Sequence, residues 1–384
     1  MKRLSKVLFL LHFPPPVHGS AIMGLSVKNS SFINQAFDCH YVNLLASKNV
    51  AESGKINFRK IFGFFSVFIK ILITLISNKP DICYLALTST GRAFYKDLLL
   101  IFLLKIFSIK RVYHLHNKGV RQYQNNFFNR FSYRFVFKDA QVILLSKNLY
   151  ADVHSFVPET NVHICPNGIA DEYLDHKDKY LHYKPLYLLP GEEKKLTKSV
   201  RILFLSNLSR AKGVYILLEA CALLSKKGVP FSCIFIGSEG DISVSEFNDR
   251  VNRLGIGEQV GYFGKRYGEE KNRAFAEADI FVFPTYFETF GLVNLEAMQH
   301  SLPVVSTLEG GIPDIVDNNV TGFLVSPKSA VALAEKIELL IQNPILRYEM
   351  GQAGRKKYES EFTLEKFEQN LTKILFEITE STSK

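Results

Sequence analysis

Residues 200–237, VRILFLSNLSRAKGVYILLEACALLSKKGVPFSCIFIG, show most clearly the pattern from which the fold class is predicted. Its two ends, VRILFLS from Val200 and FSCIFIG from Phe231, are short and almost continuously apolar. Such runs are typical of parallel strands that are covered on both faces. An apolar helical segment follows Gly213 between them. The stretch therefore predicts a strand–helix–strand unit, the building block of a parallel α/β sheet.

The same alternation continues in both directions along the chain. Further strands are predicted to begin near Lys6, Cys39, Asp81, Arg111, Gln141, Asn161, Val260, Asp279, Pro303 and Gly322. This pattern predicts an α/β fold with two doubly wound, Rossmann-like domains, residues 1–170 and residues 171–362. The charged, irregular segment Asp171–Ser199 begins at the expected boundary. We expect a ligand in the crevice between the domains, at the carboxyl ends of the strands.

Length and cysteine content agree with two domains in a reducing compartment. The chain has 384 residues, which suits two domains of about 150–200 residues. Its five cysteines are scattered and form no C-x-x-C pair, which argues against a disulfide framework or a cysteine zinc site. The N-terminal run MKRLSKVLFLLHFPPP is short, ends in three prolines and has no small-residue cleavage site. It is interpreted as a first strand and a loop rather than a signal peptide.

Positive charge is concentrated in the first half of the chain. Residues 1–170 contain 21 Lys and Arg against 7 Asp and Glu, whereas the remainder contains 26 against 30. This asymmetry suggests that one face meets something anionic, either nucleic acid or a membrane surface. A surface that only keeps the protein soluble is the plainer interpretation.

An unusually apolar helix is predicted in the basic half, at RKIFGFFSVFIKILITLIS from Arg59. A narrow polar stripe recurs at steps of three or four residues: Arg59, Gly63, Ser66, Lys70, Thr74 and Ser77. A transmembrane helix is not expected because Lys70 interrupts the apolar run. The helix is interpreted either as a crossover helix packed on the sheet or as a surface that touches lipid. The segment DLLLIFLLKIFSIK from Asp97 has the same two interpretations.

The stretch FETFGLVNLEAM, residues 287–298, places two carboxylates around a predicted helix. Glu288 is expected before the helix and Glu296 within it, and eight helical residues span about 12 Å. That length matches a nucleotide-sugar from hexose to ribose, so each carboxylate could accept bonds from sugar hydroxyls. Backbone amides of Phe290, Gly291 and Leu292 could face phosphates. The alternative is one glutamate at the helix dipole and one buried, hydrogen-bonded glutamate.

Three other loops carry candidate residues. In LSNLSRAKGV, Arg210 and Lys212 could neutralise a diphosphate, or they could be exposed basic residues. In HFPPPVHGSAIMG, Gly19 would let the backbone approach an anion near a helix start. In YHLHNKG, His114 and His116 share one face of a strand, and His116 lies where active sites form. No further ligands accompany the two histidines, so either histidine could instead be structural.

At these residues the chain resembles the retaining glycosyltransferases of the GT-B fold, in the large family-4 class (glycosyl transferases group 1) of bacterial polysaccharide and lipopolysaccharide enzymes. The strongest part is FPTYFETFGLVNLEAMQHSLPVVSTLEGGIPDIVDNNVTGFLV, residues 283–325, with its E-x7-E element, Gly-Gly-Ile-Pro loop and Thr-Gly-Phe-Leu strand. The segments PPPVHGS, HLHN, PNGI and AKG agree in order and spacing.

The resemblance implies a role for each candidate residue. Glu288 and neighbouring Thr289 would bind the donor sugar, Glu296 the ribose, and Lys212 the diphosphate. His116 would lie beside the transferred sugar, and Gly19 would approach the phosphates. The nucleotide base would lie near Gly264, Lys265 and Arg266. Residues 363–384 would form a helix that crosses back to the first domain.

One position departs from the family pattern. An arginine is common five residues before the lysine of KG, and here that position is Asn207. Either Arg210 supplies the missing charge or one cation alone holds the diphosphate. This departure leaves the donor's affinity and identity open.

The expected activity is sugar transfer from a UDP- or GDP-sugar to a saccharide acceptor, with lipid-linked saccharides favoured and retention of configuration implied by the family. No cofactor or metal is expected, because the sequence contains no D-x-D triplet. The protein is expected in the cytoplasm, on the inner face of the membrane, with an anionic membrane and not nucleic acid as its surface partner. A sugar-nucleotide 2-epimerase and a non-catalytic protein that binds anionic surfaces remain alternatives. A nicotinamide dehydrogenase is disfavoured because no G-x-G-x-x-G follows a strand.

Overall fold

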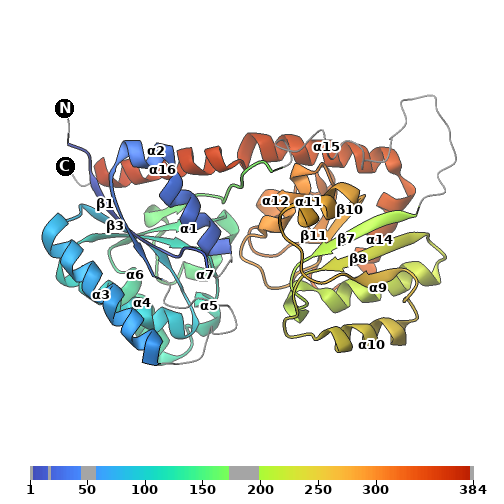
Figure 1. Cartoon of the computed structure of the whole chain (residues 1–384), viewed down its shortest axis with the longest axis horizontal. Helices are drawn as coiled ribbons and strands as arrows, with labels where there is room; N and C mark the ends of the chain where they lie inside the picture. The colour runs from blue at the N-terminus through green and yellow to red at the C-terminus, as the bar shows by residue number, and fades with distance from the viewer. Residues whose placement is uncertain (1–2, 16–18, 45–57, 173–198, 381–384) are drawn as a thin grey trace. The chain divides into compact units, whose positions relative to one another are not determined.

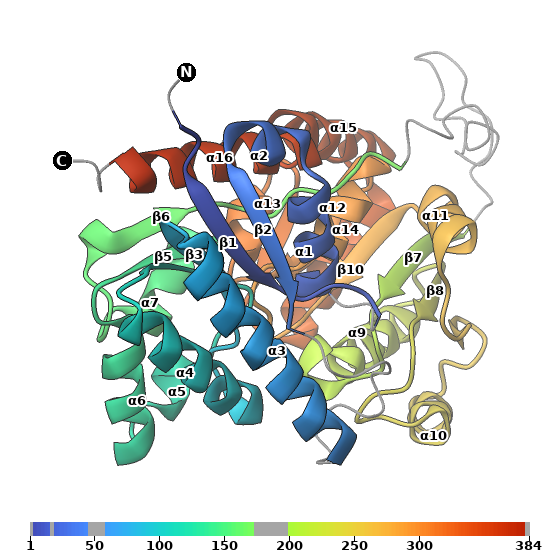
Figure 2. The same ribbon diagram turned by 60° about the vertical axis from the view of Figure 1, so that its left-hand side comes forward.

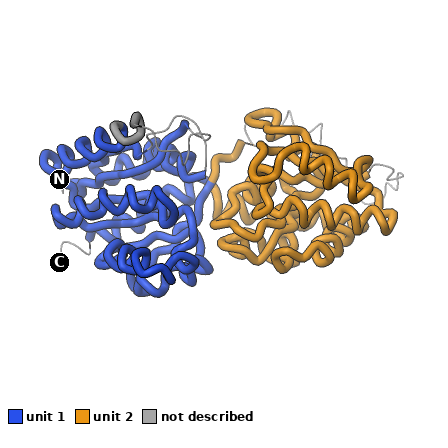
Figure 3. Tube along the Cα trace, turned by 90° about the horizontal axis from the view of Figure 1, so that it is seen from below, with its two compact units in different colours: residues 1–168, 364–384 blue, residues 169–363 orange. Residues whose placement is uncertain are grey.

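Two units, each built on a parallel sheet, make up the chain. The computed structural model describes residues 3–15, 19–44, 58–172 and 199–380. Unit 1 comprises Met1–Gly168 and Leu364–Lys384, and unit 2 comprises Ile169–Thr363 (Figure 3). These limits lie within two residues of the expected boundaries at 170 and 362. Most of the irregular segment expected at the first boundary, residues 173–198, lies outside the described residues.

The sheet of unit 1 has the strand order β2-β1-β3-β4-β5-β6, and all its neighbours are parallel. Its strands are β1 (Lys6–Leu11), β2 (Asp38–Asn43), β3 (Ile82–Leu87), β4 (Lys110–Leu115), β5 (Ala140–Leu144) and β6 (Val162–Ile164). Strand β3 is buried at every residue, as its continuous apolar sequence predicts for a strand covered on both faces.

Helices cover both faces of this sheet. Those of unit 1 are α1 (Gly19–Asn29), α2 (Ser31–Ala36), α3 (Phe58–Asn78), α4 (Gly91–Ile106), α5 (Val120–Tyr123), α6 (Phe127–Phe137), α7 (Tyr150–Val153) and α16 (Leu364–Glu380). Figures 1 and 2 show α1, α2 and α16 on one face and α3, α4 and α6 on the other. From β1 the chain moves to β2 at one edge of the sheet, whereas the later connections move toward β6 at the other edge. Because each crossover is right-handed, the helices between β1 and β2 lie on the opposite face from the helices of the later connections.

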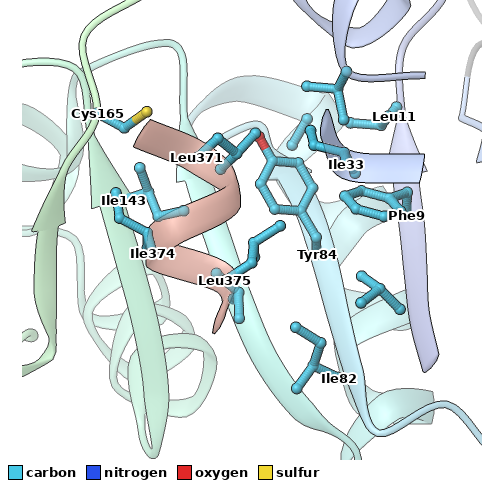
Figure 4. Packing of buried hydrophobic residues seen from close by; sticks show 14 of the residues in the cluster. Phe9, Leu11, Ile33, Ile82, Tyr84, Ile143, Cys165, Leu371, Ile374 and Leu375 are labelled. Atoms are coloured by element: carbon cyan, nitrogen blue, oxygen red, sulfur yellow. The ribbon is translucent and has the colours of Figure 1, made fainter. Parts of the chain in front are cut away.

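The last helix, α16, belongs to the core of unit 1. Its residues Leu371, Ile374 and Leu375 are buried against Phe9 and Tyr84 of the sheet (Figure 4). Because α16 is amphipathic and its apolar side is buried here, unit 1 obtains part of its core from the end of the chain.

The sheet of unit 2 has the order β12-β11-β10-β7-β8-β9 and is also parallel. Its strands are β7 (Val200–Leu205), β8 (Phe231–Ile236), β9 (Val260–Tyr262), β10 (Ile280–Phe283), β11 (Val304–Thr307) and β12 (Gly322–Val325). Its helices are α9 (Val214–Lys226), α10 (Val244–Leu254), α11 (Gly268–Glu277), α12 (Leu292–Gln299), α13 (Ile312–Ile315), α14 (Ala330–Gln342) and α15 (Pro344–Glu361). Each strand predicted from the sequence is present in one of the two sheets, so the α/β prediction is confirmed.

Helix α3 packs on the sheet through part of its polar stripe, as a crossover helix does. Thr74 of that stripe is buried, and its hydroxyl donates to the carbonyl of Lys70 at 2.8 Å and lies 3.3 Å from His40 Nε2. Exposed Phe65 and Ile73 instead face away from the core. In the part of the chain that the structure describes, no helix is long and apolar enough to cross a membrane.

Candidate functional site

The strand order of unit 2 reverses between β7 and β10, and the loops that follow these two strands meet there. β7 and β10 are neighbours, with Ile202 paired to Ile280. In a doubly wound sheet, ligands bind outside the carboxyl ends of the strands at this reversal. The loop after β7 carries Lys212, and the loop after β10 carries Glu288.

Gly213 allows these two loops to lie against each other. Its φ of 81° is left-handed, and an added Cβ would lie 2.1 Å from the carbonyl oxygen of Pro284. Only glycine fits both conditions. The loops are also joined by hydrogen bonds from Thr285 Oγ1 and the Tyr286 amide to the Ala211 carbonyl, each 2.9 Å long. The local geometry therefore fixes the position of Lys212 relative to the loop after β10.

Lys212 and Glu288 form an ion pair at this point. Lys212 Nζ lies 2.7 Å from Glu288 Oε2, and the two side chains are 29% and 18% exposed. The other carboxylate oxygen, Oε1, accepts the Thr289 amide at 2.8 Å. The pair is partly shielded yet open to a ligand. The Lys212 ammonium could bind a phosphate, and the Glu288 carboxylate could accept hydrogen bonds from sugar hydroxyls.

The Gly-Gly-Ile-Pro loop supports Glu288 from behind. Glu309 Oε1 accepts the Glu288 amide at 3.2 Å. Gly310 has a φ of 55°, and a Cβ there would lie 2.3 Å from the Glu288 carbonyl oxygen. Sequence analysis noted this loop but did not assign Glu309 to the site. The glycine pair was the signal that could have indicated close backbone contact.

Helix α12 starts beside the ion pair, at Leu292, which agrees with the expectation that Glu288 precedes the helix. Gly291, with a φ of 91°, precedes Leu292, and no side chain caps the helix. Residues 288–291 are therefore not helical, so only the steps from Leu292 to Glu296 rise as a helix, by about 6 Å instead of the expected value of about 12 Å. The uncapped amides at this end remain suited to an anion.

Glu296 pairs with Lys271, which also pairs with Glu172, and sequence analysis assigned neither Lys271 nor Glu172 to the site. Lys271 Nζ on α11 lies 3.2 Å from Glu296 Oε1 and 3.7 Å from Glu172 Oε2. Asn272 Nδ2 also donates to Glu172 at 3.1 Å. Burial raises the pKa of the Glu296 carboxyl, and Lys271 opposes this effect. Burial opposes the charge of Lys271, but Glu296 and Glu172 together raise its pKa. The Glu296 carboxylate, whose basicity is raised by burial, therefore lies beside the Lys271 cation.

Nothing in the sequence distinguished Lys271 or Glu172 from their charged neighbours. Lys271 lies in the run GEEKNR, and Glu172 lies in the irregular segment. Glu172 is placed by the residue before it, because Asp171 is paired with the Arg355 guanidinium of α15. Tyr358 also donates to the Ile169 carbonyl at 2.9 Å. Only the folded chain brings these distant segments to Glu296.

Arg210 does not join the Lys212–Glu288 pair. Its Nη2 lies 2.7 Å from Glu246 Oε1, and its Nε lies 4.0 Å from Asp241. Tyr215 donates to the same Glu246 oxygen at 2.6 Å. The side chain of Arg210 is 55% exposed. The structure thus pairs Arg210 with acidic residues that follow β8, so it does not take the place of the arginine missing at Asn207.

The remaining donor-side candidates lie at the ends of β7 and β9. Asn207 is exposed immediately after β7. The Gly264 carbonyl accepts the Gly237 amide at 2.9 Å, which ties the loop after β9 to the loop after β8. Lys265 Nζ lies 4.5 Å from the Tyr267 ring centre, and Arg266 pairs with Glu270 at 3.3 Å.

In unit 1, the two histidines have different surroundings. His114 on β4 is fully buried, and its Nδ1 lies 2.5 Å from the Tyr84 hydroxyl. Burial, with a smaller contribution from His116, lowers its pKa well below the usual value. His116 follows the end of β4 and is only partly buried, with its ring centre 4.2 Å from that of His114. His114 is thus part of the core, whereas His116 lies at the carboxyl end of the sheet.

Gly19 is the first residue of α1, close to the helix start expected at Ser20. Residues 16–18, which precede it, lie outside the described residues. Ser20 Oγ lies 3.4 Å from Nδ1 of His12, the residue that directly follows β1. In unit 1, Gly19 and His116 are thus both placed after carboxyl ends of strands.

The second half of the chain is similar in sequence to known protein families and proteins. Residues 189–357 match the family described as "Glycosyl transferases group 1". The capsular polysaccharide biosynthesis glycosyltransferase CapM of Staphylococcus aureus is 30% identical over 160 residues, 42% of this chain and 41% of that protein. The amylovoran biosynthesis glycosyltransferase AmsK of Erwinia amylovora is 32% identical over 186 residues, 47% and 45% of the two chains. The chain thus spans less than half the length of these two relatives.

Solved structures match the whole chain. The crystal structure of Anabaena Alr3699/HepE in complex with UDP-glucose has a TM-score of 0.70 and 20% identity, and the match covers 97% of this chain and 99% of that one. At this identity the likeness establishes the fold. The residues described above therefore lie on two α/β units of the GT-B fold, each built on a sheet of parallel strands.

Proposed function

We propose that this chain, whose residues 189–357 match the group 1 glycosyl transferases, is a glycosyltransferase of polysaccharide biosynthesis that uses a nucleotide-sugar donor. The observation that carries the proposal is the Lys212–Glu288 pair, 2.7 Å apart at the strand reversal of unit 2. A cation for a diphosphate and an acceptor for sugar hydroxyls stand together at the place where this fold binds ligands. We place the donor here.

Donor binding would separate the functions of these two side chains. The diphosphate attracts the Lys212 ammonium, which is a point charge on a flexible stem. Glu288, whose Oε1 is already held by the Thr289 amide, then accepts hydroxyl groups of the sugar through Oε2. The uncapped amides from Phe290 to Leu292 lie at the positive end of α12 and suit the phosphate oxygens.

The ribose would bind at Glu296, with Lys271 as a positioning residue. The 3.2 Å contact of Lys271 with Glu296 favours the ionised carboxylate, which accepts two ribose hydroxyls better than a carboxylic acid does. The base would lie toward Gly264, Lys265 and Arg266, at the end of β9. Because the similar Anabaena structure is in complex with UDP-glucose, UDP-sugars are the first donors to test.

In the proposed reaction the bond between the anomeric carbon and the diphosphate oxygen breaks, and a bond from that carbon to the acceptor hydroxyl oxygen forms. The bonding electrons leave with the nucleoside diphosphate, and the acceptor hydroxyl loses its proton. Lys212 and the α12 amides stabilise the charge that develops on the leaving group. We further propose retention of the anomeric configuration, a role for His116 and Gly19 near the sugar and phosphates, and independence from metal ions.

The acceptor we propose is a lipid-linked saccharide at the inner face of the cytoplasmic membrane. The basic composition of residues 1–170 supports an anionic surface as partner. Lipopolysaccharide is one product class that would be consistent with this acceptor, and capsular polysaccharide is another.

The decisive experiment measures UDP release and sugar transfer from UDP-glucose and other UDP- and GDP-sugars, with and without a chelator. Glu288→Ala should reduce turnover by about 100-fold or more, because it removes a group that contacts the sugar. Glu338→Ala is the matched control, since Glu338 also pairs with a lysine, Lys227, but lies on α14. Full activity of Glu288→Ala, with folding intact, would refute the site.

A sugar-nucleotide 2-epimerase is distinguished in the same assay. An epimerase converts the donor without an acceptor and produces a C2 epimer, whereas the proposed transferase leaves the unreacted donor unchanged. Donor epimerisation without transfer to any acceptor would replace the proposal with that alternative.

A further inference from the structure

Helices α3, α4 and α6 are apolar on two sides, although the core requires only one. On α4, Leu100, Ile101 and Leu104 are buried toward the sheet. Further apolar side chains of the three helices are exposed: Phe65, Ile69, Ile73, Ile76, Tyr95, Leu99, Phe102, Ile106, Phe127, Phe128 and Phe131. We call these eleven residues the outer apolar face. A helix that is apolar all round is normally buried on all sides, so folding of unit 1 does not explain this face.

The outer apolar face forms regular stripes. Residues 65, 69, 73 and 76 recur along one side of α3, and residues 95, 99, 102 and 106 recur along one side of α4. α6 lies against α4, with Tyr95 and Phe128 rings 5.7 Å apart and Phe102 and Phe135 rings 6.4 Å apart. Figures 1 and 2 both show α3 beside α4 on the same face of the sheet. The stripes therefore point away from the sheet in one direction and form a single surface.

The charges of these helices are almost entirely positive. Their basic residues are Arg59, Lys60, Lys70, Arg92, Lys96, Lys105, Arg130 and Arg134. Their acidic residue is Asp97, which is fully buried and accepts the Thr88 amide at 3.0 Å. Lys105 Nζ lies 4.4 Å from the Phe135 ring centre, so its stem runs along an aromatic side chain. Exposed phenylalanines and isoleucines thus stand among cations with no exposed carboxylate on the same helices.

This charge pattern distinguishes between possible partners. A second copy would bring the same patch against itself in a two-fold dimer, and the exposed cations of one copy, such as Arg130 and Arg134, would face those of the other. An anionic phospholipid surface offers the opposite charge together with an apolar interior for the phenylalanines. Contiguous exposed apolar patches of this kind mark interaction sites.

We propose that the outer apolar face of α3, α4 and α6 is a docking surface for an anionic lipid bilayer, into whose interfacial region the exposed Phe and Ile side chains insert. The role that we give to this docking rests on the proposed function: it would hold the enzyme at a membrane that contains its lipid-linked acceptor. Binding to lipid itself requires no turnover, so the two proposals are tested separately.

The test is co-sedimentation of the full chain with vesicles of phosphatidylcholine alone or with phosphatidylglycerol added. We expect at least tenfold stronger partitioning to the vesicles that contain phosphatidylglycerol, and weaker partitioning as salt rises. The variant Phe127→Ser/Phe131→Ser should lose at least tenfold in partitioning, because these side chains are 85% and 64% exposed and are free to insert. Its melting temperature and its UDP-glucose turnover in solution should match those of the parent chain.

The matched control changes two exposed apolar residues of unit 2. Val331→Ser/Ile345→Ser replaces side chains that are 60% and 72% exposed on α14 and α15, and it should bind vesicles as the parent does. A second variant, Arg130→Glu/Arg134→Glu, should lose the preference for phosphatidylglycerol. The proposal is overturned if the parent remains in the supernatant with both vesicles at low salt, or if the control loses as much binding as Phe127→Ser/Phe131→Ser. A dimer in sedimentation velocity that Phe127→Ser/Phe131→Ser dissociates would overturn it in favour of a second copy.

Discussion

Among single residues, Lys212 and Lys271 each pair with a different glutamate of the candidate site. Lys212 faces Glu288 and Lys271 faces Glu296. Each carboxylate of the E-x7-E element therefore already has a cation beside it. This pairing sets an opposite charge beside each carboxylate, and it places positive charge where we propose that the nucleoside diphosphate binds.

Lys212→Ala should abolish the rise in melting temperature that UDP produces in the parent protein, and should reduce turnover by about 100-fold or more. The reason is the loss of the cation closest to Glu288. Lys227→Ala is the control because it breaks another lysine–glutamate pair, on the surface at α9. A UDP-induced shift in Lys212→Ala equal to that of the parent would contradict the assignment.

Lys271→Met should weaken UDP binding, and the weakening should be larger at pH 6 than at pH 8. Lys271 opposes the burial that raises the pKa of Glu296. Without it that pKa rises further, and more of the carboxyl is protonated as the pH falls. Calorimetric titration with UDP at both pH values measures the effect. Arg273→Met, on the same helix but paired with Glu277, should show no such pH dependence.

Asp97→Asn should stabilise unit 1 more at pH 7 than at pH 4. Burial raises the pKa of Asp97 to about 6. For an acid whose folded pKa exceeds its unfolded value, the folded state binds the proton more tightly. Stability is therefore lost as the pH rises from about 4 to about 6, by up to about 3 kcal/mol.

Asparagine at position 97 keeps an acceptor for the Thr88 amide and does not titrate. Urea unfolding of both proteins across this pH range measures the difference, with Asp81→Asn as an exposed control. Parallel pH profiles for Asp97→Asn and the parent would show that Asp97 does not titrate in the folded protein.

At the scale of elements, the contact between the loops after β7 and β10 decides the site. These loops belong to strands that are far apart in sequence but adjacent in the sheet. The close approach depends on Gly213, whose Cα faces the Pro284 carbonyl. Glycines with left-handed φ lie at both ends of helix α9, Gly213 before it and Gly228 after it. Of these two, Gly213 packs against another loop, whereas a Cβ at Gly228 would meet no atom within 4 Å.

Gly213→Ala should destabilise the protein and abolish UDP binding, whereas Gly228→Ala should cost about 1 kcal/mol and leave binding intact. Both positions have positive φ, 81° and 70°. A Cβ at Gly213 would lie 2.1 Å from Pro284 O, while a Cβ at Gly228 meets nothing within 4 Å. Urea unfolding and UDP titration of the two variants separate the clash from backbone strain. If both substitutions reduced stability and UDP binding equally, the contact between Gly213 and Pro284 would not be the cause.

At the scale of the whole molecule, unit 1 is completed by the last helix of the chain. Deletion after Thr363 removes α16 and with it Phe367, Leu371, Ile374, Leu375 and Ile378 from the core of unit 1. Each loss of a buried aliphatic side chain costs about 2–5 kcal/mol, so the unit should unfold. Limited proteolysis should then degrade residues 3–168 before residues 199–363.

Deletion after Glu380 is the control for the truncation, because it retains all of α16. That protein should show the parent's pattern of digestion. Resistance of unit 1 to protease in the shorter protein would mean that its core is stable without α16.

The amino-acid sequence alone predicted the two α/β units and singled out much of the donor-side residue set that we propose. Continuous apolar runs of strand length indicated both sheets, since parallel strands that are buried on both faces need apolar side chains throughout. The glutamates of FETFGLVNLEAM and the lysine of AKG stood out because charge in such apolar surroundings is costly unless a partner or ligand compensates it.

Which charged side chains pair with each other depends on the folded chain. Arg210 and Lys212 are two residues apart in sequence, yet one pairs with Glu246 and the other with Glu288. Lys271 of α11 pairs with Glu296, and Glu172, at the start of unit 2, pairs with Lys271. The outer apolar face is likewise a tertiary feature, because α3, α4 and α6 share it only when packed on one sheet. Local patterns specify elements through periodicity, but long-range contacts depend on the sheet's strand order, which no single segment encodes.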